Sequence, residues 1–322
     1  MPQVVDEALE FIKRRREGLE PSLKTKSDKI NNIFLNGFDW NRIVTIAGLS
    51  GTGKSTLTRQ LINEMIELNP TQDFEVLSFQ FEMLSTDEVA RDISSKVNKS
   101  IKEVYSASSP LSDEDFNLIT SELQKLKSHN INVVDNPGTA KEIKDTIINF
   151  VETTKLADRK AGLIVSIDNS LLVKREDKQD EKSAIDDLMF TLVALKKYLS
   201  SINVKCLFFL VSQLNRNIET VDRITNPKLH YPNKGDLFGA SSVFNGSDYV
   251  VIIHKPCLID GLGNWYGPAR KGWQQGLPVF NPINPTQAMI YLHVIKERFG
   301  KPAIIAMLDD LQVGKISEYV KE

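Results

Sequence analysis

The chain has 322 residues, of which 41% are apolar and 25% charged, so it can build one large globular domain or two small ones. Its 40 lysines and arginines against 42 acidic residues exclude a globally basic nucleic-acid coat, although a local basic channel stays possible. The charged N-terminal segment does not resemble a signal peptide, and no stretch approaches the ~18 consecutive apolar residues of a membrane span. Two cysteines, Cys206 and Cys257, fit a reducing compartment, so we expect a cytoplasmic protein.

The N-terminal segment predicts one amphipathic helix. Val5, Leu9 and Ile12 recur at spacings of four and three, which gives the first ~18 residues a narrow apolar stripe on a charged helix. Residues 21–29 are polar and without a periodic pattern, so we interpret them as a linker. This pattern divides the chain into an N-terminal helix and linker, residues 1–29, and a main domain, residues 30–322.

Short apolar runs then alternate with longer helical stretches. Strands are expected at 43–47, 75–81, 131–134, 163–167 and 206–211, and helices at 54–68, after Ser85, at 112–127 and at 182–200. Runs that are apolar on both faces are typical of a buried parallel sheet, so the pattern predicts a doubly wound α/β fold. The runs 249–253, 289–295 and 303–308 are expected to add late strands, antiparallel in part.

A phosphate-binding loop follows the first strand of this domain. The segment Gly48-Leu49-Ser50-Gly51-Thr52-Gly53-Lys54-Ser55 fits G-x-x-x-x-G-K-[ST] at every position, between a strand and a helix as the motif requires. Backbone N–H groups, the helix N-terminus and Lys54 suit a triphosphate, and the Ser55 hydroxyl suits Mg²⁺. The predicted nucleotide-binding residues are Gly48, Ser50, Gly51, Thr52, Gly53, Lys54, Ser55 and Thr56, with ATP and Mg²⁺ as cofactors.

Polar residues at three other strand ends complete a candidate catalytic set. Asp168 ends an apolar strand, where a carboxylate can reach the metal, although Asp in such a place is often only a turn or helix cap. Glu82 ends the strand 75–81 and is a candidate base for the attacking water. An exposed strand-end Glu would look the same. Gln213 follows the strand 206–211 and could sense the γ-phosphate.

Together these segments resemble the motor domain of DnaB-type replicative helicases, a RecA-like P-loop NTPase. Beside the phosphate loop, the resemblance rests on five stretches in the family's order: FQFEMLS (79–85), VSIDNSLLV (165–173), VSQLNR (211–216), DLFGASSVFNGSDYVVIIHK (236–255) and VIKERFGKP (294–302). It covers about residues 30–308, and the family's N-terminal helical domain has no counterpart in this sequence. Residues 256–287 form a longer insertion than the family leads us to expect.

The resemblance implies an ATP-hydrolysing ring, usually a hexamer, that translocates on single-stranded DNA during replication in a bacterial cytoplasm, or as a phage protein in its host. It assigns Glu82 as the catalytic carboxylate, Asp168 as the metal ligand and Gln213 as the sensor. It places Lys296 and Arg298 on the nucleotide of a neighbouring subunit. Primase or a helicase loader is a candidate partner, and no membrane is expected.

Candidate DNA contacts are cations in polar loops, which can grip phosphates without reading bases. They are Lys174, Arg175, Arg216, Arg223 and Lys228, although each taken singly is more often ordinary solvated surface. Stacking of His254, Trp265 or Trp273 on bases is less expected than packing in the core or at an interface.

Two other functions remain open from the sequence. A RecA- or KaiC-like ATPase could assemble on DNA or protein without unwinding, and a nucleotide-gated scaffold could help to load a helicase. Intact Glu82 and Gln213 speak against the scaffold, because a protein that only binds nucleotide needs neither.

Overall fold

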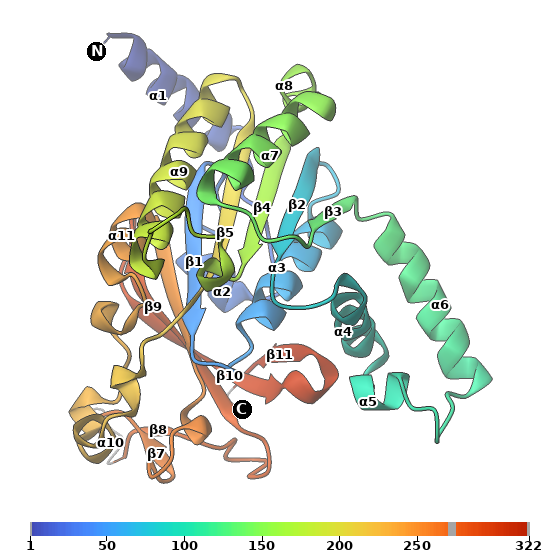
Figure 1. Ribbon diagram of the computed structural model, residues 1–322, viewed down its shortest axis with the longest axis vertical. Coiled ribbons are helices and arrows are strands. Elements are labelled where there is room, and N and C mark those ends of the chain that lie inside the picture. Colours follow the sequence, from blue (N-terminus) through green and yellow to red (C-terminus); the bar gives the residue numbers. More distant parts are fainter. Residues whose placement is uncertain (1, 270–274, 321–322) are drawn as a thin grey trace.

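Nine strands form one twisted sheet in the computed structural model, which describes residues 2–269 and 275–320 (Figure 1). From edge to edge they are β11 (Lys315–Glu318), β10 (Ala303–Asp310), β9 (Met289–Glu297), β6 (Tyr249–His254), β1 (Arg42–Gly48), β5 (Lys205–Gln213), β4 (Gly162–Asp168), β2 (Phe74–Gln80) and β3 (Ile131–Val134). The strands from β6 to β3 run parallel, so their carboxyl ends meet at one edge. At the other end of the sheet, β9, β10 and β11 are antiparallel additions.

Helices cover both faces of this sheet. Those of eight or more residues are α1 (Pro2–Arg16), α3 (Lys54–Leu68), α4 (Ser85–Val97), α6 (Asp113–Lys127), α7 (Ala140–Thr153) and α9 (Glu181–Ser201). The shorter ones are α2 (Asp28–Ile33), α5 (Ile101–Val104), α8 (Leu156–Arg159), α10 (Val221–Thr225) and α11 (Ala240–Gly246). A separate two-stranded ribbon, β7 (Trp265–Tyr266) with β8 (Leu277–Pro278), lies in the long insertion. The doubly wound α/β fold predicted from the alternating runs is confirmed.

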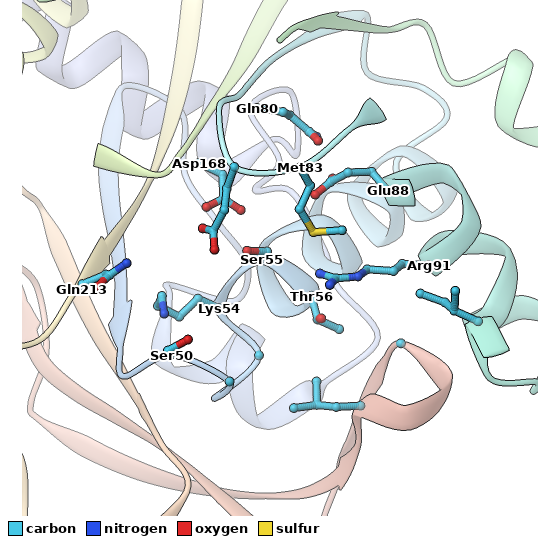
Figure 2. A pocket seen from close by; sticks show the side chains of 16 residues that line it. Ser50, Lys54, Ser55, Thr56, Gln80, Met83, Glu88, Arg91, Asp168 and Gln213 are labelled. Carbon is cyan, nitrogen blue, oxygen red and sulfur yellow. The ribbon is translucent and has the colours of Figure 1, made fainter. Parts of the chain in front are cut away.

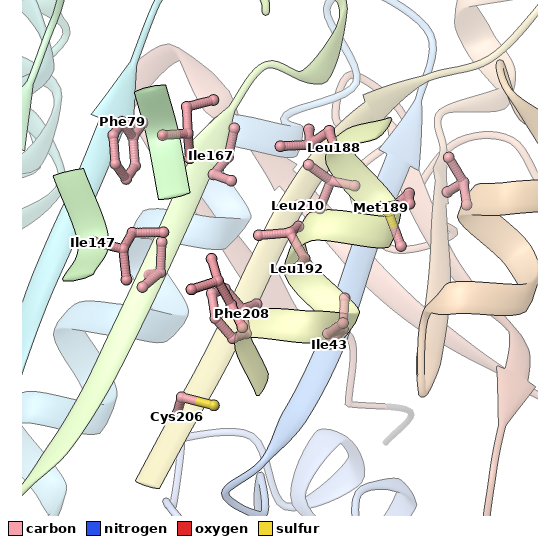
Figure 3. Packing of buried hydrophobic residues seen from close by; sticks show 14 of the residues in the cluster. Ile43, Phe79, Ile147, Ile167, Leu188, Met189, Leu192, Cys206, Phe208 and Leu210 are labelled. Carbon is pink, nitrogen blue, oxygen red and sulfur yellow. The ribbon is translucent and has the colours of Figure 1, made fainter. Parts of the chain in front are cut away.

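Two apolar cores form because side chains alternate along each buried strand. Ile43 and Phe208 face the layer of α7, α9 and α11, where Figure 3 shows them packed with Leu188, Leu192 and Leu210. Their neighbours Val44 and Phe209 face the opposite layer of α2 and α3. Burial on both faces explains why the central strands read as continuous apolar runs.

Residues 22–25 differ from the sequence prediction of a linker. Leu23 is fully buried and pairs with Phe38 in a short antiparallel bridge, while Ser22 and Thr25 are almost completely covered. The Asn31 amide ties this stretch down, because its Oδ1 accepts hydrogen bonds from the Thr25 N–H and hydroxyl. Individual contacts, and not one continuous apolar face, fix the residues of this segment. A search for hydrophobic periodicity therefore does not detect it.

Helix α7 lies outside the elements that the apolar pattern predicted, although the sequence carries a signal for it. The Thr139 hydroxyl accepts a hydrogen bond from the Glu142 N–H, and the Glu142 carboxylate accepts one from the Thr139 N–H. This reciprocal arrangement is the capping box expected from Thr-x-x-Glu before an apolar run. Ile143, Ile147 and Val151 then pack one face of α7 on the sheet.

Helix α1 has the predicted bounds and stripe, but within the chain its apolar side chains are uncovered. Val5 is 63% exposed, Leu9 51% and Ile12 62%. Its last turn is tied to the domain, where Arg15 donates hydrogen bonds to Glu20, Ser22 and Asp39. Within the described ranges, no helix is long and apolar enough to cross a bilayer.

Candidate nucleotide-binding site

The phosphate loop joins β1 to α3 and depends on glycines at three places. Gly51 and Gly53 have φ of 76° and 92°, a region that other residues rarely adopt. A Cβ on Gly48 would lie 2.6 Å from the Thr52 hydroxyl oxygen and 2.7 Å from the Ile253 carbonyl oxygen. The motif therefore encodes a backbone path that closely approaches its neighbours.

The loop and the carboxyl ends of the neighbouring strands enclose a pocket of about 440 Å³ (Figure 2). Of the predicted phosphate-loop residues, Ser50, Gly51, Gly53, Lys54, Ser55 and Thr56 line it. Thr52 does not, because it is fully buried and donates its hydroxyl to the Leu49 carbonyl oxygen at 2.9 Å. Its contribution is to the shape of the loop.

Lys54 lies largely buried at the floor of this pocket. Its Nζ donates to the Leu49 carbonyl oxygen at 2.9 Å. Burial lowers the pKa of Lys54, and the nearby carboxylates of Asp168 and Glu82 counteract this shift by favouring the charged ammonium. A largely buried ammonium that faces the pocket is stabilised when an anion binds there. This position suits the phosphates of a nucleotide.

Asp168 ends β4 opposite Gln80, the last residue of β2, and the peptide bond after it is cis. Burial raises the pKa of Asp168 to about 6, and a hydrogen bond from the Ser55 hydroxyl partly offsets that rise. Its Oδ1 is buried without a hydrogen-bond partner among the described residues. An unpaired carboxylate oxygen beside a hydroxyl offers the hard oxygen ligands that Mg²⁺ prefers, so the residues fit this ion.

Other strand ends bring the remaining predicted residues to the same pocket. Gln213 is the last residue of β5 and pairs in register with Gly48. Glu82 lies two residues beyond β2, where its Oε2 accepts a hydrogen bond from the Asn169 amide at 3.2 Å. The pocket thus combines the loop, a metal-side carboxylate, a second carboxylate and an amide. In the part of the chain that the structure describes, no cluster of three or more His, Cys, Asp or Glu side chains could hold a metal by itself.

Several lining residues lie outside the sequence motifs. They are Gln80, Met83, Glu88, Arg91, Ile101, Leu311 and Gly314. Glu88 is paired with Arg59 at 2.7 Å, whereas no partner is found for the Arg91 side chain across residues 2–269 and 275–320. The sequence predicts the helix that carries Arg91 but does not indicate which of its faces meets the pocket.

Lys296 and Arg298 are not in this pocket. They lie at the end of β9, whose Glu297 pairs with Tyr249 at the start of β6, so they occupy the opposite edge of the sheet. The Lys296 Nζ donates to the Phe244 and Asn245 carbonyl oxygens at 2.6 and 3.2 Å, and Arg298 pairs with Asp248. Neither side chain can serve the nucleotide pocket of its own chain.

The five candidate DNA-binding cations separate into two kinds. Lys174, Arg175, Arg216 and Lys228 are exposed in loops that follow β4 and β5. Arg223 is different, because its guanidinium is paired within its own chain. It binds both carboxylate oxygens of Asp236, at 2.9 and 3.1 Å, as well as two backbone carbonyl oxygens. A guanidinium paired in this way holds the loop together, which favours a structural role for Arg223.

His254 packs in the core as expected. It is almost fully buried, and its Nδ1 lies 2.6 Å from the Tyr266 hydroxyl, which is 2.7 Å from Nε2 of His293. Trp265 is 41% exposed on β7, and Trp273 lies outside the described residues. Tyr266 therefore joins the long insertion to strands β6 and β9.

A strand–loop–helix phosphate site at the carboxyl edge of a parallel sheet defines a P-loop NTPase. Comparisons with known proteins give the family. The family model for the DnaB-like helicase C terminal domain matches residues 22–308, and the chain belongs to that family, the ATPase motor of replicative helicases. Among curated proteins, no significant match is found.

Solved structures agree on the fold. One of them, described as an ATPase domain, superposes with a TM-score of 0.71 at 16% identity, covering 98% of this chain and 99% of that one. A DnaB-like replicative helicase, described with its interactions with primase, superposes with a TM-score of 0.71 at 17% identity, covering 98% of this chain and 67% of that one. A KaiC-like protein from the hyperthermophilic archaeon Pyrococcus horikoshii OT3 superposes with a TM-score of 0.54 at 12% identity, covering 93% of this chain and 99% of that one. At such identities these likenesses describe the fold alone.

Proposed function

We propose that this protein is an ATP-driven DNA helicase motor that works as a ring and translocates on single-stranded DNA. The carrying observation is the division of the site between two edges of the sheet. Lys54, Glu82, Asp168 and Gln213 meet in one pocket, while Arg298 lies at the far edge. Because Arg298 cannot reach the pocket of its own chain, a role for it at the transition state requires the nucleotide of a neighbouring copy.

Each residue has a distinct task in this proposal. The loop amides and Lys54 hold the phosphates, and Ser55 with Asp168 would hold Mg²⁺, which neutralises charge on the phosphate oxygens when bound. Glu82 takes a proton from the attacking water, and the amide of Asn169 orients this carboxylate. Gln213, at the end of β5, contacts the γ-phosphate and precedes the loop of Arg216. Loss of this phosphate therefore changes the position of a DNA-facing loop.

The exposed cations after β4 and β5 are proposed to face single-stranded DNA in the ring. Both loops leave the same edge of the sheet as the nucleotide pocket, because the two strands are parallel neighbours. A homo-oligomer, a hexamer by family resemblance, and a cytoplasmic location follow from the same proposal. Primase or a loader remains a candidate partner.

The test is ATP hydrolysis with and without single-stranded DNA, with particle mass measured by light scattering on the same sample. We expect a ring whose hydrolysis rate rises with DNA and which separates a fork with a 5′ tail. Stimulation without strand separation would favour the RecA- or KaiC-like ATPase. Nucleotide binding without hydrolysis would favour the scaffold, and both outcomes would contradict the helicase proposal.

A further inference from the structure

Asp248 is a buried carboxylate that no motif of the nucleotide pocket includes. It directly precedes β6, and its side chain is 2% exposed. Its Oδ2 accepts hydrogen bonds from the backbone N–H of Ile43, at 2.9 Å, and from Nζ of Lys196, at 2.6 Å. Its Oδ1 lies 3.1 Å from Nε of Arg298. One carboxylate thus joins the first strand, helix α9 and the end of β9.

The pairing leaves the outer part of Arg298 open. Asp248 contacts Nε, and in the described part of the chain no partner is found for the two terminal nitrogens, Nη1 and Nη2. The Arg298 side chain is 51% exposed although the carboxylate that holds it is buried. Because the guanidinium is planar, fixing Nε also restricts the plane in which Nη1 and Nη2 lie.

Lys296 lies two residues earlier on β9 and is held differently. Its Nζ is engaged by the Phe244 and Asn245 carbonyl oxygens at the end of α11 and lies 5.1 Å from the centre of the Phe244 ring. Its ammonium is therefore directed at its own chain. Of the two cations at this edge, Arg298 is the one whose donors remain available within the described residues.

The local charge favours an anion at this place. Lys196 is 17% exposed and paired with Asp248, and the Lys296 ammonium is engaged by backbone carbonyl oxygens, so Arg298 is the cation of this cluster that faces outward. Asp248 satisfies the inner side of the cluster, where an unpaired buried charge would be costly. The outer side, at Arg298, remains unneutralised, and its two terminal N–H₂ groups match the oxygens of a phosphate.

We propose that Asp248 is a positioning residue that fixes the Arg298 guanidinium with its terminal nitrogens facing the nucleotide of a neighbouring copy. The inference rests on the proposed trans role of Arg298 and adds the group that orients it. A long Arg side chain loses rotamer freedom when it binds, and prior fixation by a buried carboxylate removes part of that cost before the transition state forms. The effect therefore belongs to turnover and not to ATP affinity.

The first experiment compares Asp248→Asn with Lys196→Met in the full chain. Asn keeps an acceptor for the Ile43 N–H but loses the charge that holds Arg298, so we expect kcat to fall about 10- to 100-fold with unchanged ATP affinity. Lys196→Met removes the other cation from the same carboxylate and leaves Arg298 paired, so its kcat should stay close to wild type. Equal losses in both variants would overturn the proposal.

Mixing experiments distinguish loss of the Arg298 orientation from a general disturbance of the folded subunit. Asp248→Asn protein mixed with Glu82→Gln protein should regain activity, since some interfaces then combine an intact pocket with an intact Asp248–Arg298 edge. Mixing Asp248→Asn with Arg298→Ala should give no recovery, because both lesions affect the same edge. Recovery in the second mixture, or none in the first, would contradict the assignment.

Arg298→Lys tests the same geometry without changing the buried carboxylate. A lysine ammonium cannot pair with Asp248 through one nitrogen and present two others, so we expect turnover as low as in Arg298→Ala. Wild-type turnover in Arg298→Lys would overturn the positioning role. Wild-type turnover in Arg298→Ala would instead remove the trans role itself, which distinguishes failure of the proposed function from failure of this inference.

Discussion

Lys54 and Glu82 line the same pocket but differ in what they contact. Lys54 is buried beside the loop backbone, whereas Glu82 is exposed to the pocket and held by the Asn169 amide. This contrast predicts different kinetic losses. Lys54→Ala should weaken nucleotide binding, while Glu82→Gln should bind ATP normally and lose about 10²- to 10⁴-fold in turnover, because Gln cannot accept the proton. Equilibrium binding of a fluorescent ATP analogue and single-turnover hydrolysis measure the two; wild-type hydrolysis by Glu82→Gln would refute its role as base.

Arg91 is predicted to hold the nucleoside end of ATP. Ser55 and Asp168 lie at the end of the pocket proposed to hold Mg²⁺, while Figure 2 shows Arg91 on the side of Thr56. Arg91→Ala should therefore weaken ATP binding but leave binding of inorganic tripolyphosphate unchanged, whereas Lys54→Ala weakens both. Calorimetric titration with the two ligands measures this. Lys102→Ala, an exposed cation nearby that does not line the pocket, is the control; equal losses for both ligands in Arg91→Ala would make Arg91 a phosphate ligand instead.

His254 predicts a pH dependence of stability. Burial lowers the pKa of His254 to about 3, with further lowering by Arg223 and His230. Between about pH 6.5 and 3 the unfolded chain binds a proton at this position and the folded chain does not, so the free energy of unfolding falls as the pH falls. The stability advantage of wild type over His254→Gln should shrink between pH 7 and pH 5 in urea unfolding. An advantage that stays constant or grows over this range would contradict the buried neutral imidazole.

At the scale of elements, α1 presents an apolar stripe that its own chain leaves uncovered. We predict that the stripe packs on a neighbouring subunit, since burying it removes apolar surface from water. Replacing Val5, Leu9 and Ile12 by Ser should lower the particle mass in light scattering and leave the monomer folded by circular dichroism. This substitution tests the stripe more specifically than deletion of the helix does, because it preserves the hydrogen bond from Arg15 to Asp39. Ala at Glu10 and Lys13 is the matched control, and an unchanged ring in the Ser variant would refute the prediction.

For the whole molecule, the proposal that the loops after β4 and β5 face single-stranded DNA predicts how DNA binding depends on their cations. Lys174→Ala with Arg216→Ala should weaken binding of single-stranded DNA and reduce the slope of log affinity against log salt by about 1.4, at ~0.7 for each lost phosphate contact. Arg223→Ala should chiefly lower the thermal unfolding midpoint, since it breaks the pairing with Asp236. Fluorescence anisotropy at several salt concentrations measures the slope. An unchanged slope in the double variant would exclude these cations from the DNA path.

The sequence predicted those parts of the site that local pattern encodes. A glycine-rich loop between an apolar strand and a helix identifies a phosphate site, because only glycine readily adopts the backbone of Gly51 and Gly53. Asp168 and Gln213 were also predicted from local pattern, because each ends an apolar strand and the carboxyl ends of parallel strands meet at one edge of the sheet. Arg91 could not be placed in this way, because which face of α4 meets the pocket depends on how that helix packs.

Charge type and sequence position alone did not distinguish a free cation from a paired one. Arg223 and Arg216 look alike in the sequence, yet only the folded chain brings Asp236 to Arg223. The same holds for Arg298, whose partner Asp248 lies far earlier in the chain and is buried between helix α9 and strand β9. Sequence by itself determined the fold class, the phosphate loop and the family. Tertiary structure decided which charges are satisfied, because ion pairing depends on distances between segments that no local pattern contains.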